Sequence, residues 1–286
     1  MYLFKKVSDY QRWLRQVRDQ GATIGFFPTM GALHQGHLSL FETSKKENDR
    51  TVCSIFVNPT QFNDPKDLEK YPRIPGKDIE MLATAGVDVL FIPDVSEIYP
   101  KNLTFDVPID LGHLDQVLEG SFRPGHFKGV VQVVKRLLDI IQPDSLYMGQ
   151  KDFQQLTIIR HMIEQLNLAI KLVACPTVRE KDGLAMSSRN VRIEPAHRPL
   201  APLIFQALTA AKESAGILKP EQIKATATAQ INQPPFKVEY FEIVDGQTLL
   251  PVKRFQDAET VIACTAVWLG AVRLIDNLIV KAPDQD

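Results

Sequence analysis

The chain has 286 residues, of which 44% are apolar, and its formal net charge is −1. This length predicts one large domain or two modest ones. The nearly neutral charge argues against broad nucleic-acid binding, which usually requires an excess of basic residues.

The cysteines and the apolar runs indicate the environment of the chain. Cys53, Cys175 and Cys264 lie far apart, without a Cys-x-x-Cys pair. The N-terminus lacks the apolar core of a signal peptide, and no run reaches the roughly 18 apolar residues of a membrane span. We therefore expect a cytoplasmic protein with reduced thiols.

The first two-thirds of the chain alternates strand-like and helix-like segments. Short apolar runs predict strands at residues 22–27, 51–57, 87–92, 145–148 and 170–174. Apolar residues at helical spacing predict helices at residues 36–46, 77–85, 127–141 and 153–166. This alternation indicates β-α-β units around a parallel sheet, and the continuous apolar character of the strands indicates that both faces are covered.

The pattern changes after about Pro176. Two helices are expected at residues 199–215 and 220–231, followed by strands at residues 237–244, 260–269 and 273–280. Helices followed by strands suggest a small α+β domain. We therefore predict an α/β protein with one domain over residues 1–176 and a second over residues 177–286.

Residues 28–37, Pro-Thr-Met-Gly-Ala-Leu-His-Gln-Gly-His, lie between a predicted strand and a predicted helix. Ligands of such sheets bind beyond the carboxyl ends of strands, and a helix amino end suits phosphate. Gly31 and Gly36 allow close approach of the backbone, and His34 and His37 can donate hydrogen bonds to phosphate oxygens as pyrophosphate departs. Alternatives are a turn with two incidental histidines, or a metal-binding pair without an obvious third ligand. The sequence favours a site for the triphosphate of ATP.

Residues 179–190, Arg-Glu-Lys-Asp-Gly-Leu-Ala-Met-Ser-Ser-Arg-Asn, form a polar stretch after the last strand of the predicted parallel sheet. A mobile loop that carries hydroxyl groups can close over a triphosphate. Arg189 can bind phosphate oxygens in a bidentate manner. A plain polar linker between domains is the alternative.

Residues 149–155, Gly-Gln-Lys-Asp-Phe-Gln-Gln, also connect a strand to a helix. Lys151 is suited to the α-phosphate, and Asp152 can cap the helix or help to hold Mg²⁺. Gln155 lies almost one turn further and can face the same pocket. An ordinary helix start is the alternative.

Two loops carry weaker signals. Asn58 and Gln61 flank a proline turn, and their amides can recognise hydroxyl and carboxylate groups. Arg123 and His126 lie in an irregular segment before a helix and can serve an anion. Each loop also fits a purely structural turn.

The order of these segments resembles a known family. His34-Gln-Gly-His37 is similar to the His-x-Gly-His signature of the nucleotidyltransferase and class I aminoacyl-tRNA synthetase superfamily, and residues 179–190 resemble its Lys-Met-Ser-Lys-Ser loop. Together with residues 54–62, 71–73, 118–130, 149–155 and 266–277, they resemble the pantothenate synthetase, or pantoate–β-alanine ligase, family. The resemblance extends from about residue 20 to about residue 280.

The resemblance implies a fold, a reaction and partners. The fold is a Rossmann-like nucleotide domain with a smaller α+β lid domain, and the protein works as a homodimer. The reaction joins pantoate to β-alanine with ATP and Mg²⁺, through a pantoyl adenylate, and releases AMP and pyrophosphate. No tightly bound organic cofactor, nucleic acid or membrane is implied.

The resemblance also implies site residues. The catalytic residues are His34, His37, Lys151 and Arg189, with His37 as the proton donor. ATP-binding residues are Met30, Gly31, Ala32, Leu33, His34, Gln35, Gly36, His37, Gly149, Gln150, Lys151, Asp152, Val178, Met186, Ser187, Ser188 and Arg189. The pantoate contacts that it implies are Gln61 and Gln155, with Gln61 also near β-alanine. From their residue types alone, we add Asn58 and Arg123 as pantoate-binding residues and Asp152 as a metal ligand.

Two rival functions follow from the same motifs. One is another adenylate-forming or nucleotidyl-transferring enzyme of the superfamily that acts on a different small carboxylate. The other is a non-catalytic nucleotide-binding module. A tRNA-binding synthetase is disfavoured by the charge balance and by the lack of an anticodon-binding domain.

Overall fold

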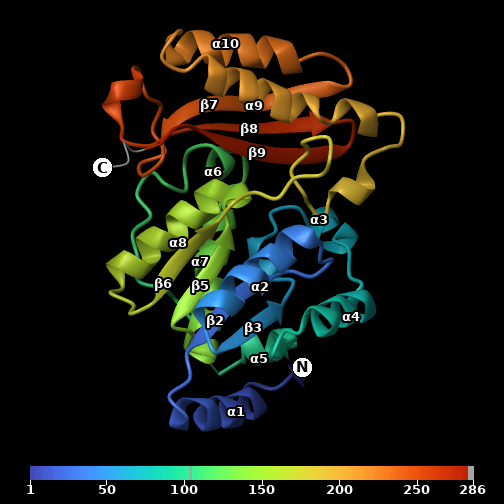
Figure 1. The fold of residues 1–286 in the computed structure, drawn as a ribbon, viewed down its shortest axis with the longest axis vertical. Coiled ribbons are helices and arrows are strands. Elements are labelled where there is room, and N and C mark those ends of the chain that lie inside the picture. Colours follow the sequence, from blue (N-terminus) through green and yellow to red (C-terminus); the bar gives the residue numbers. More distant parts are fainter. Residues whose placement is uncertain (103–104, 283–286) are drawn as a thin grey trace. The chain divides into compact units, whose positions relative to one another are not determined.

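Two sheets organise the residues that the computed structural model describes, 1–102 and 105–282 (Figure 1). The first unit comprises Met1–Asp115, Arg123–Gly149 and Ile158–Pro176. The second comprises Gln116–Phe122, Gln150–Thr157 and the chain from Thr177 onward. The units are therefore not two continuous ranges, and the division into domains 1–176 and 177–286 stays a prediction.

The first unit is built on a six-stranded parallel sheet with the order β1-β4-β3-β2-β5-β6. Its strands are β1 (Tyr2–Phe4), β2 (Ile24–Thr29), β3 (Arg50–Ile55), β4 (Val89–Phe91), β5 (Ser145–Gly149) and β6 (Lys171–Cys175). The sheet confirms the α/β class that the alternating pattern predicts.

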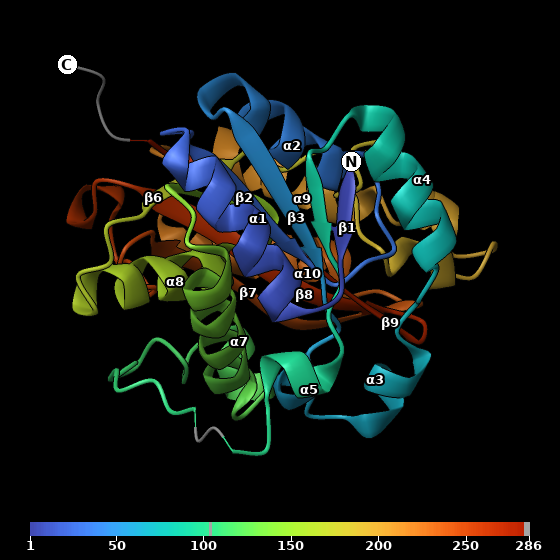
Figure 2. The same ribbon diagram turned by 90° about the horizontal axis from the view of Figure 1, so that it is seen from below.

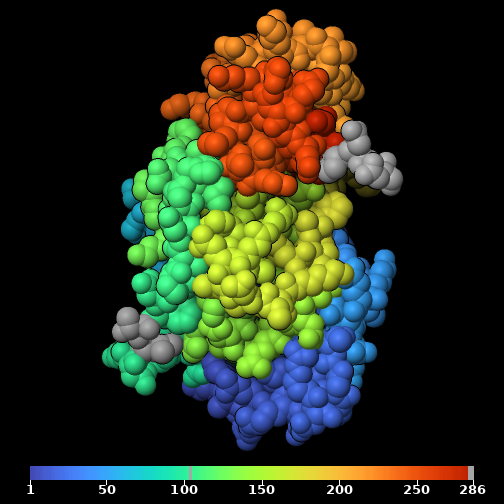
Figure 3. All heavy atoms as spheres, turned by 90° about the vertical axis from the view of Figure 1, so that its left-hand side faces the viewer, coloured from blue at the N-terminus to red at the C-terminus, as the bar shows by residue number. Residues whose placement is uncertain are grey.

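Helices cover both faces of this sheet (Figure 2). The helices of this unit are α1 (Val7–Asp19), α2 (Gln35–Glu47), α3 (Pro65–Lys70), α4 (Pro75–Ala85), α5 (Val95–Ile98), α7 (His126–Ile141) and, from Ile158 onward, α8 (Phe153–Gln165). Right-handed crossovers put α2 and α4 on one face and α1 and α7 on the other. Figure 3 shows the side on which the edge strand β6 and the end of α8 reach the surface.

The strand order changes direction between β2 and β5. After β2 the chain moves to β3 and then β4, whereas after β5 it moves the opposite way to β6. Because β2 and β5 are paired in parallel, both end at the same edge of the sheet, after Thr29 and Gly149. This is the switch point at which ligands of open α/β sheets bind.

Buried apolar side chains hold β2 in place in the sheet and so set the position of its carboxyl end. Phe26 and Phe27 of β2 are fully buried, and Phe27 packs with Phe41 of α2 and Leu90 of β4. Burying one such side chain stabilises a fold by about 1.5–3 kcal/mol.

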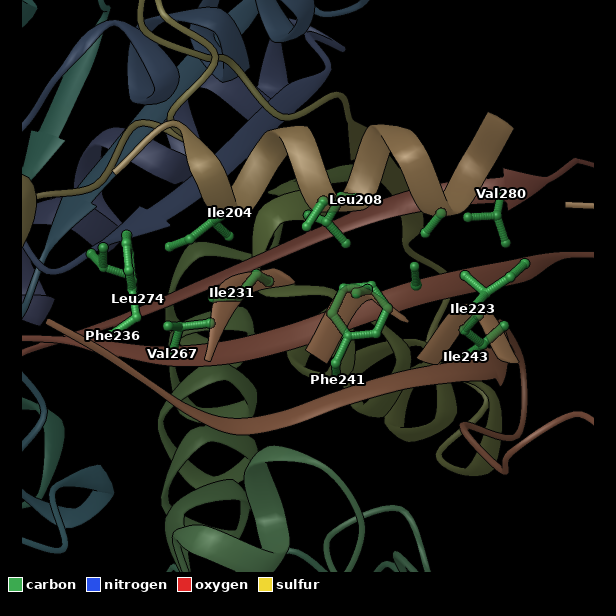
Figure 4. Close-up of a cluster of buried hydrophobic side chains, with 14 of the residues drawn as sticks. Ile204, Leu208, Ile223, Ile231, Phe236, Phe241, Ile243, Val267, Leu274 and Val280 are labelled. Atoms are coloured by element: carbon green, nitrogen blue, oxygen red, sulfur yellow. The ribbon is translucent and has the colours of Figure 1, made fainter. Parts of the chain in front are cut away.

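The second unit contains an antiparallel sheet of β7 (Phe236–Asp245), β8 (Val261–Leu269) and β9 (Val272–Lys281). The helices α9 (Leu203–Glu213) and α10 (Pro220–Ile231) pack on it, and α6 (Glu119–Phe122) is also counted here. Figure 4 shows Ile204 and Leu208 of α9 pointing from the helix toward the strands, and they form one buried cluster with Ile223 of α10 and Phe241 of β7. The α+β composition agrees with the prediction.

Several elements were not predicted from the sequence. β1 has three residues, too few for a periodic signal. α1 has its buried Tyr10, Leu14 and Val17 at helical spacing, so periodicity could have identified it. The helix expected at residues 199–215 is shorter, because Arg198–Leu200 form a 3-10 turn and α9 begins after Pro202. No helix among the described residues is both long and apolar enough to cross a membrane.

We predict that Gly129→Ala destabilises the protein. A Cβ atom on Gly129 of α7 would lie 2.5 Å from the carbonyl oxygen of Thr60 and 2.8 Å from Cα of Gln61. Relieving such overpacking costs about 1–3 kcal/mol. Gly76 of α4 is the matched control, because a Cβ there meets nothing within 4 Å. Chemical denaturation should give Gly76→Ala equal or up to about 1 kcal/mol higher stability. Equal stability of the two variants would contradict the prediction.

Candidate active site

The turn between β2 and α2 is held by a buried carboxylate. Asp78 of α4 is 2% exposed and accepts hydrogen bonds from the backbone N–H groups of Ala32 (3.0 Å) and Leu33 (2.8 Å). Gly31 has φ +82°, and a Cβ there would lie 3.0 Å from Oδ2 of Asp78. Ala32 has φ +49°, a left-handed conformation that costs about 1–2 kcal/mol. The two hydrogen bonds of Asp78 offset this strain and define the path of the turn.

His34 and His37 form a reciprocal cap at the amino end of α2. Nδ1 of His34 accepts a hydrogen bond from the N–H of Gly36, and Nδ1 of His37 accepts one from the N–H of His34, both at 3.2 Å. A neutral imidazole has one donor and one acceptor nitrogen. In this cap, a neutral ring therefore carries its proton on Nε2. The ring centroids are 4.1 Å apart.

This cap determines what the turn can do chemically. Two Nε2–H groups add hydrogen-bond donors to a helix end that already favours anions. No group of three or more His, Cys, Asp or Glu residues suited to a metal ion occurs among the described residues. The arrangement suits phosphate oxygens.

The loop after β3 is anchored through Asn58, which is 1% exposed. Its Nδ2 donates to the carbonyl oxygen of Gly129 (3.1 Å) and to Oε1 of Gln61 (3.2 Å). Its Oδ1 accepts from the hydroxyl groups of Thr60 and Tyr99, each at 3.1 Å. The amide of Asn58 is thus engaged within the protein. Its expected contact with pantoate stays a prediction.

Gln61 is held from two sides. The carbonyl oxygen of Gln61 accepts a hydrogen bond from Nδ1 of His126 at 2.7 Å, and its Nε2 lies 3.2 Å from Sδ of Met30. The Met30 contact brings Gln61 beside the turn after β2.

Two other predicted site residues lie in the first unit. Arg123 lies half-buried, three residues before His126 at the start of α7. Gly149 is the last residue of β5, the strand paired with β2.

The second unit contains the other group of predicted site residues. Gln150–Asp152 form a 3-10 turn, in which Nζ of Lys151 lies 3.7 Å from Oδ1 of Asp152. The Asp152 side chain is 49% exposed, whereas that of Lys151 is 19% exposed. Gln155 is half-buried in the first turn of α8.

Gln154 and Glu119 were not predicted from the sequence. The Gln154 amide accepts from the N–H of Glu119 (2.9 Å) and donates to the carbonyl oxygen of Val117 (2.8 Å). The Glu119 carboxylate pairs with Arg273 (2.7 and 2.8 Å) and accepts from the Tyr240 hydroxyl (2.8 Å). Burial lowers the pKa of Arg273, but Glu119 and Glu239 raise it above its ordinary value.

The loop that begins at Val178 folds back on itself. The N–H of Met186 donates to the carbonyl oxygen of Val178 (3.0 Å), and the N–H of Glu180 donates to that of Leu184 (2.8 Å). Nδ2 of Asn190 donates to Oε1 of Glu180 (2.8 Å). Ser187, Ser188 and Arg189 are half-buried at the end of this folded segment. The hydroxyl and guanidinium groups thus stand on an anchored loop.

The three thiols are unsuited to nucleophilic catalysis. Cys53, Cys175 and Cys264 are buried and unpaired with one another. Burial raises the pKa of each thiol above its ordinary value. Since the thiolate is the nucleophile, these cysteines are inert structural residues.

Comparisons with known proteins identify the family. The family model for pantoate–β-alanine ligase matches residues 2–279. The pantothenate synthetase of Porphyromonas gingivalis (strain W83) is 46% identical over 279 residues, which cover 97% of this chain and 99% of the relative. That of Coprothermobacter proteolyticus is 43% identical over 285 residues, 98% of this chain and 99% of the relative.

Solved structures agree with the sequence relatives. Pantothenate synthetase from Thermus thermophilus has a TM-score of 0.92 and 40% identity, over 98% of this chain and 100% of the other. The pantoate–β-alanine ligase of Francisella tularensis, solved in complex with β-γ ATP and β-alanine, has a TM-score of 0.80 and 34% identity over 98% of each chain. This chain belongs to the pantoate–β-alanine ligase family and is a ligase that forms a carbon–nitrogen bond.

Proposed function

We propose that the chain condenses pantoate with β-alanine at the expense of ATP, through an enzyme-bound pantoyl adenylate. The observation that supports this most directly is the reciprocal histidine cap, which leaves both Nε2 atoms protonated at the end of α2. Those donors follow β2, one of the two strands that flank the switch point. An Nε2–H donor can bind a triphosphate and stabilise a departing pyrophosphate.

The first step makes the carboxylate of pantoate reactive. A carboxylate oxygen attacks the α-phosphorus of ATP, a new P–O bond forms, and the bond to the β-phosphate oxygen breaks. Pyrophosphate carries away the electron pair. Hydrogen bonds from His34 and His37 stabilise the charge on the departing group, and Lys151 and Arg189 reduce repulsion between the two anions. One such preorganised donor contributes about 3–4 kcal/mol to the transition state.

The second step forms the amide. The neutral amine of β-alanine attacks the pantoyl carbonyl, AMP leaves with the electron pair of the acyl–oxygen bond, and the nitrogen loses a proton. No protein nucleophile takes part, which agrees with the protonated, buried cysteines. Positioning of the amine supplies much of the rate, since oriented groups reach effective molarities of about 10⁵ M or more.

We assign binding roles to the predicted site residues of the first unit and to those of the second unit. Gln61, Gln155 and Arg123 bind pantoate, and Gln61 also contacts β-alanine. Asn58 acts mainly by holding Gln61, because its own amide is engaged within the protein. The backbone from Met30 to His37, Gly149–Asp152, Val178 and residues 186–189 bind ATP.

The proposal also includes bound Mg²⁺, a homodimer and a cytoplasmic location. Mg²⁺ typically binds one or two carboxylates together with substrate phosphates, and the half-exposed carboxylate of Asp152 fits that role. When bound, Mg²⁺ would neutralise charge on the triphosphate. We also propose a homodimer in the cytoplasm, and the three reduced cysteines suit that compartment.

The test of this function is a product analysis with isotope tracing. Purified protein should convert pantoate, β-alanine and ATP to pantothenate, AMP and pyrophosphate in equal amounts. With pantoate labelled by ¹⁸O in its carboxylate, one ¹⁸O atom should appear in AMP. Formation of ADP and phosphate, or unlabelled AMP, would overturn the adenylate route.

Loss of either side chain proposed to bind the phosphates, His37 or Lys151, should slow the first step selectively. We predict that His37→Ala and Lys151→Ala each slow pyrophosphate release by at least ~10² in single turnovers, with the fold intact. His161→Ala and Lys171→Ala are controls, because these side chains make surface contacts with the carbonyl oxygen of Asp110 and the carboxylate of Glu47. Near-normal single-turnover rates in the His37 or Lys151 variant would refute the role of that residue.

Weakening the support of the turn should impair ATP use. In Asp78→Asn an NH₂ group replaces one of the two acceptor oxygens, so the N–H group of Ala32 or of Leu33 faces a donor instead of an acceptor. We predict a rise of about tenfold or more in KM for ATP, since small misplacements of binding groups are costly. Asp88→Asn is the control, because Asp88 accepts from the N–H of Thr51 near the amino end of β3. An equal effect of both substitutions in steady-state kinetics would contradict the prediction.

A further inference from the structure

Asn277 of β9 holds the backbone around Lys151. Its side chain is 3% exposed, and Nδ2 donates to the carbonyl oxygens of Gln150 (3.0 Å) and Lys151 (2.8 Å). Only the NH₂ group of an amide can donate to two carbonyl oxygens, so the orientation of this side chain is fixed. The turn that carries Lys151 is thereby attached to the sheet of the second unit.

The preceding residue, Asp276, holds the other predicted phosphate-binding segment. Its carboxylate is 5% exposed and binds the Arg179 guanidinium through two hydrogen bonds of 2.6 and 3.0 Å. Arg179 also donates to the carbonyl oxygen of Gly183 (3.1 Å), within the folded loop that ends at Arg189. Asp276 therefore anchors the base of that loop.

The two anchors are coupled through the strand. Successive residues of a strand face opposite sides, so Asp276 and Asn277 reach different segments from one piece of backbone. Both residues are paired with β8, at Thr265 and Cys264. The N–H of Asn277 donates to Oδ1 of Asp276 at 2.8 Å, and the Asn277 carbonyl oxygen accepts from Arg179 at 3.3 Å. A paired strand is a more rigid support than either loop.

Electrostatics are consistent with this arrangement. Burial raises the pKa of Asp276 above its ordinary value, although the ion pair with Arg179 opposes that rise. The positive charge of Lys151 also lowers the pKa of Asp276. The ammonium group of Lys151 therefore lies within electrostatic reach of the strand that holds its backbone.

We propose that Asn277 is a positioning residue for the adenylation step: it fixes the backbone of Lys151 so that the ammonium group meets the α-phosphate. The proposal deepens the proposed function and rests on the role assigned there to Lys151. Asn277 touches neither substrate nor reacting atoms, so its effect must pass through Lys151.

The test uses Asn277→Ala, Lys151→Ala and the double variant of the full-length protein. Single-turnover pyrophosphate release with saturating ATP and pantoate should fall about tenfold or more in Asn277→Ala, since misplaced groups lose rate steeply. In the Lys151→Ala background the same substitution should change the rate by less than about twofold, because coupled residues are not additive. The β-alanine-dependent release of AMP should stay within about twofold of the unmodified protein, since Lys151 serves the first step.

Lys281→Met provides a matched structural control. Lys281 also lies on β9, and its Nζ donates to two carbonyl oxygens, those of Phe255 (3.1 Å) and Ala258 (2.8 Å). Its loss removes the same number of hydrogen bonds from the same strand, so it should lower the melting temperature without lowering the pyrophosphate release rate. If Asn277→Ala does not fold, Asn277→Ser keeps one donor and should show a smaller loss of the same kind.

The outcomes separate the failure of this proposal from the failure of the proposed function. If Lys151→Ala slows the first step but Asn277→Ala and Asn277→Ser do not, the positioning role is overturned. It is also overturned if Asn277→Ala slows pyrophosphate release by the same factor in the Lys151→Ala variant as in the unmodified protein. That result would indicate a general structural loss. If the unmodified protein forms no adenylate, or Lys151→Ala retains the full rate, the proposed function or the role of Lys151 fails first and this proposal falls with it.

Discussion

The parallel pairing of β2 with β5 is the constraint on which the first unit depends. It requires the two strands to end at one edge of the sheet, and the strand order reverses between them. The buried phenylalanines of β2 fix that edge, and Asp78 then bends the following turn so that α2 begins with its histidine cap. Apolar burial positions the strands, whereas a few buried polar contacts set the conformation of the site.

Much of the fold could be predicted from periodicity. The helix at residues 220–231 has the predicted limits, and α2, α7 and α8 differ from theirs by a residue or so at each end. Apolar runs bounded by proline, glycine or asparagine are local signals, so these elements are visible without tertiary information. The strand–turn–helix context of His34 and His37 was likewise visible, but the protonation of Nε2 required the hydrogen-bond geometry.

The supporting residues could not be predicted because they act across long sequence separations. Asp78 holds a turn 45 residues earlier, Glu119 binds Arg273 154 residues later, and Asn277 holds Lys151 from 126 residues away. Each is an ordinary polar residue, and nothing local distinguishes it from a surface side chain. The same contacts group residues 116–122 and 150–157 with the second unit. A continuous boundary drawn from composition does not reveal such long-range grouping.

The most direct measurement of the central claim is isotope exchange between ATP and pyrophosphate without β-alanine. A reversible first step that joins AMP to pantoate requires exchange that depends on pantoate and stops when pantoate is omitted. Addition of β-alanine should then release AMP and form pantothenate. Exchange that proceeds equally without pantoate, or that appears only when β-alanine is present, would contradict a pantoyl adenylate as the first product.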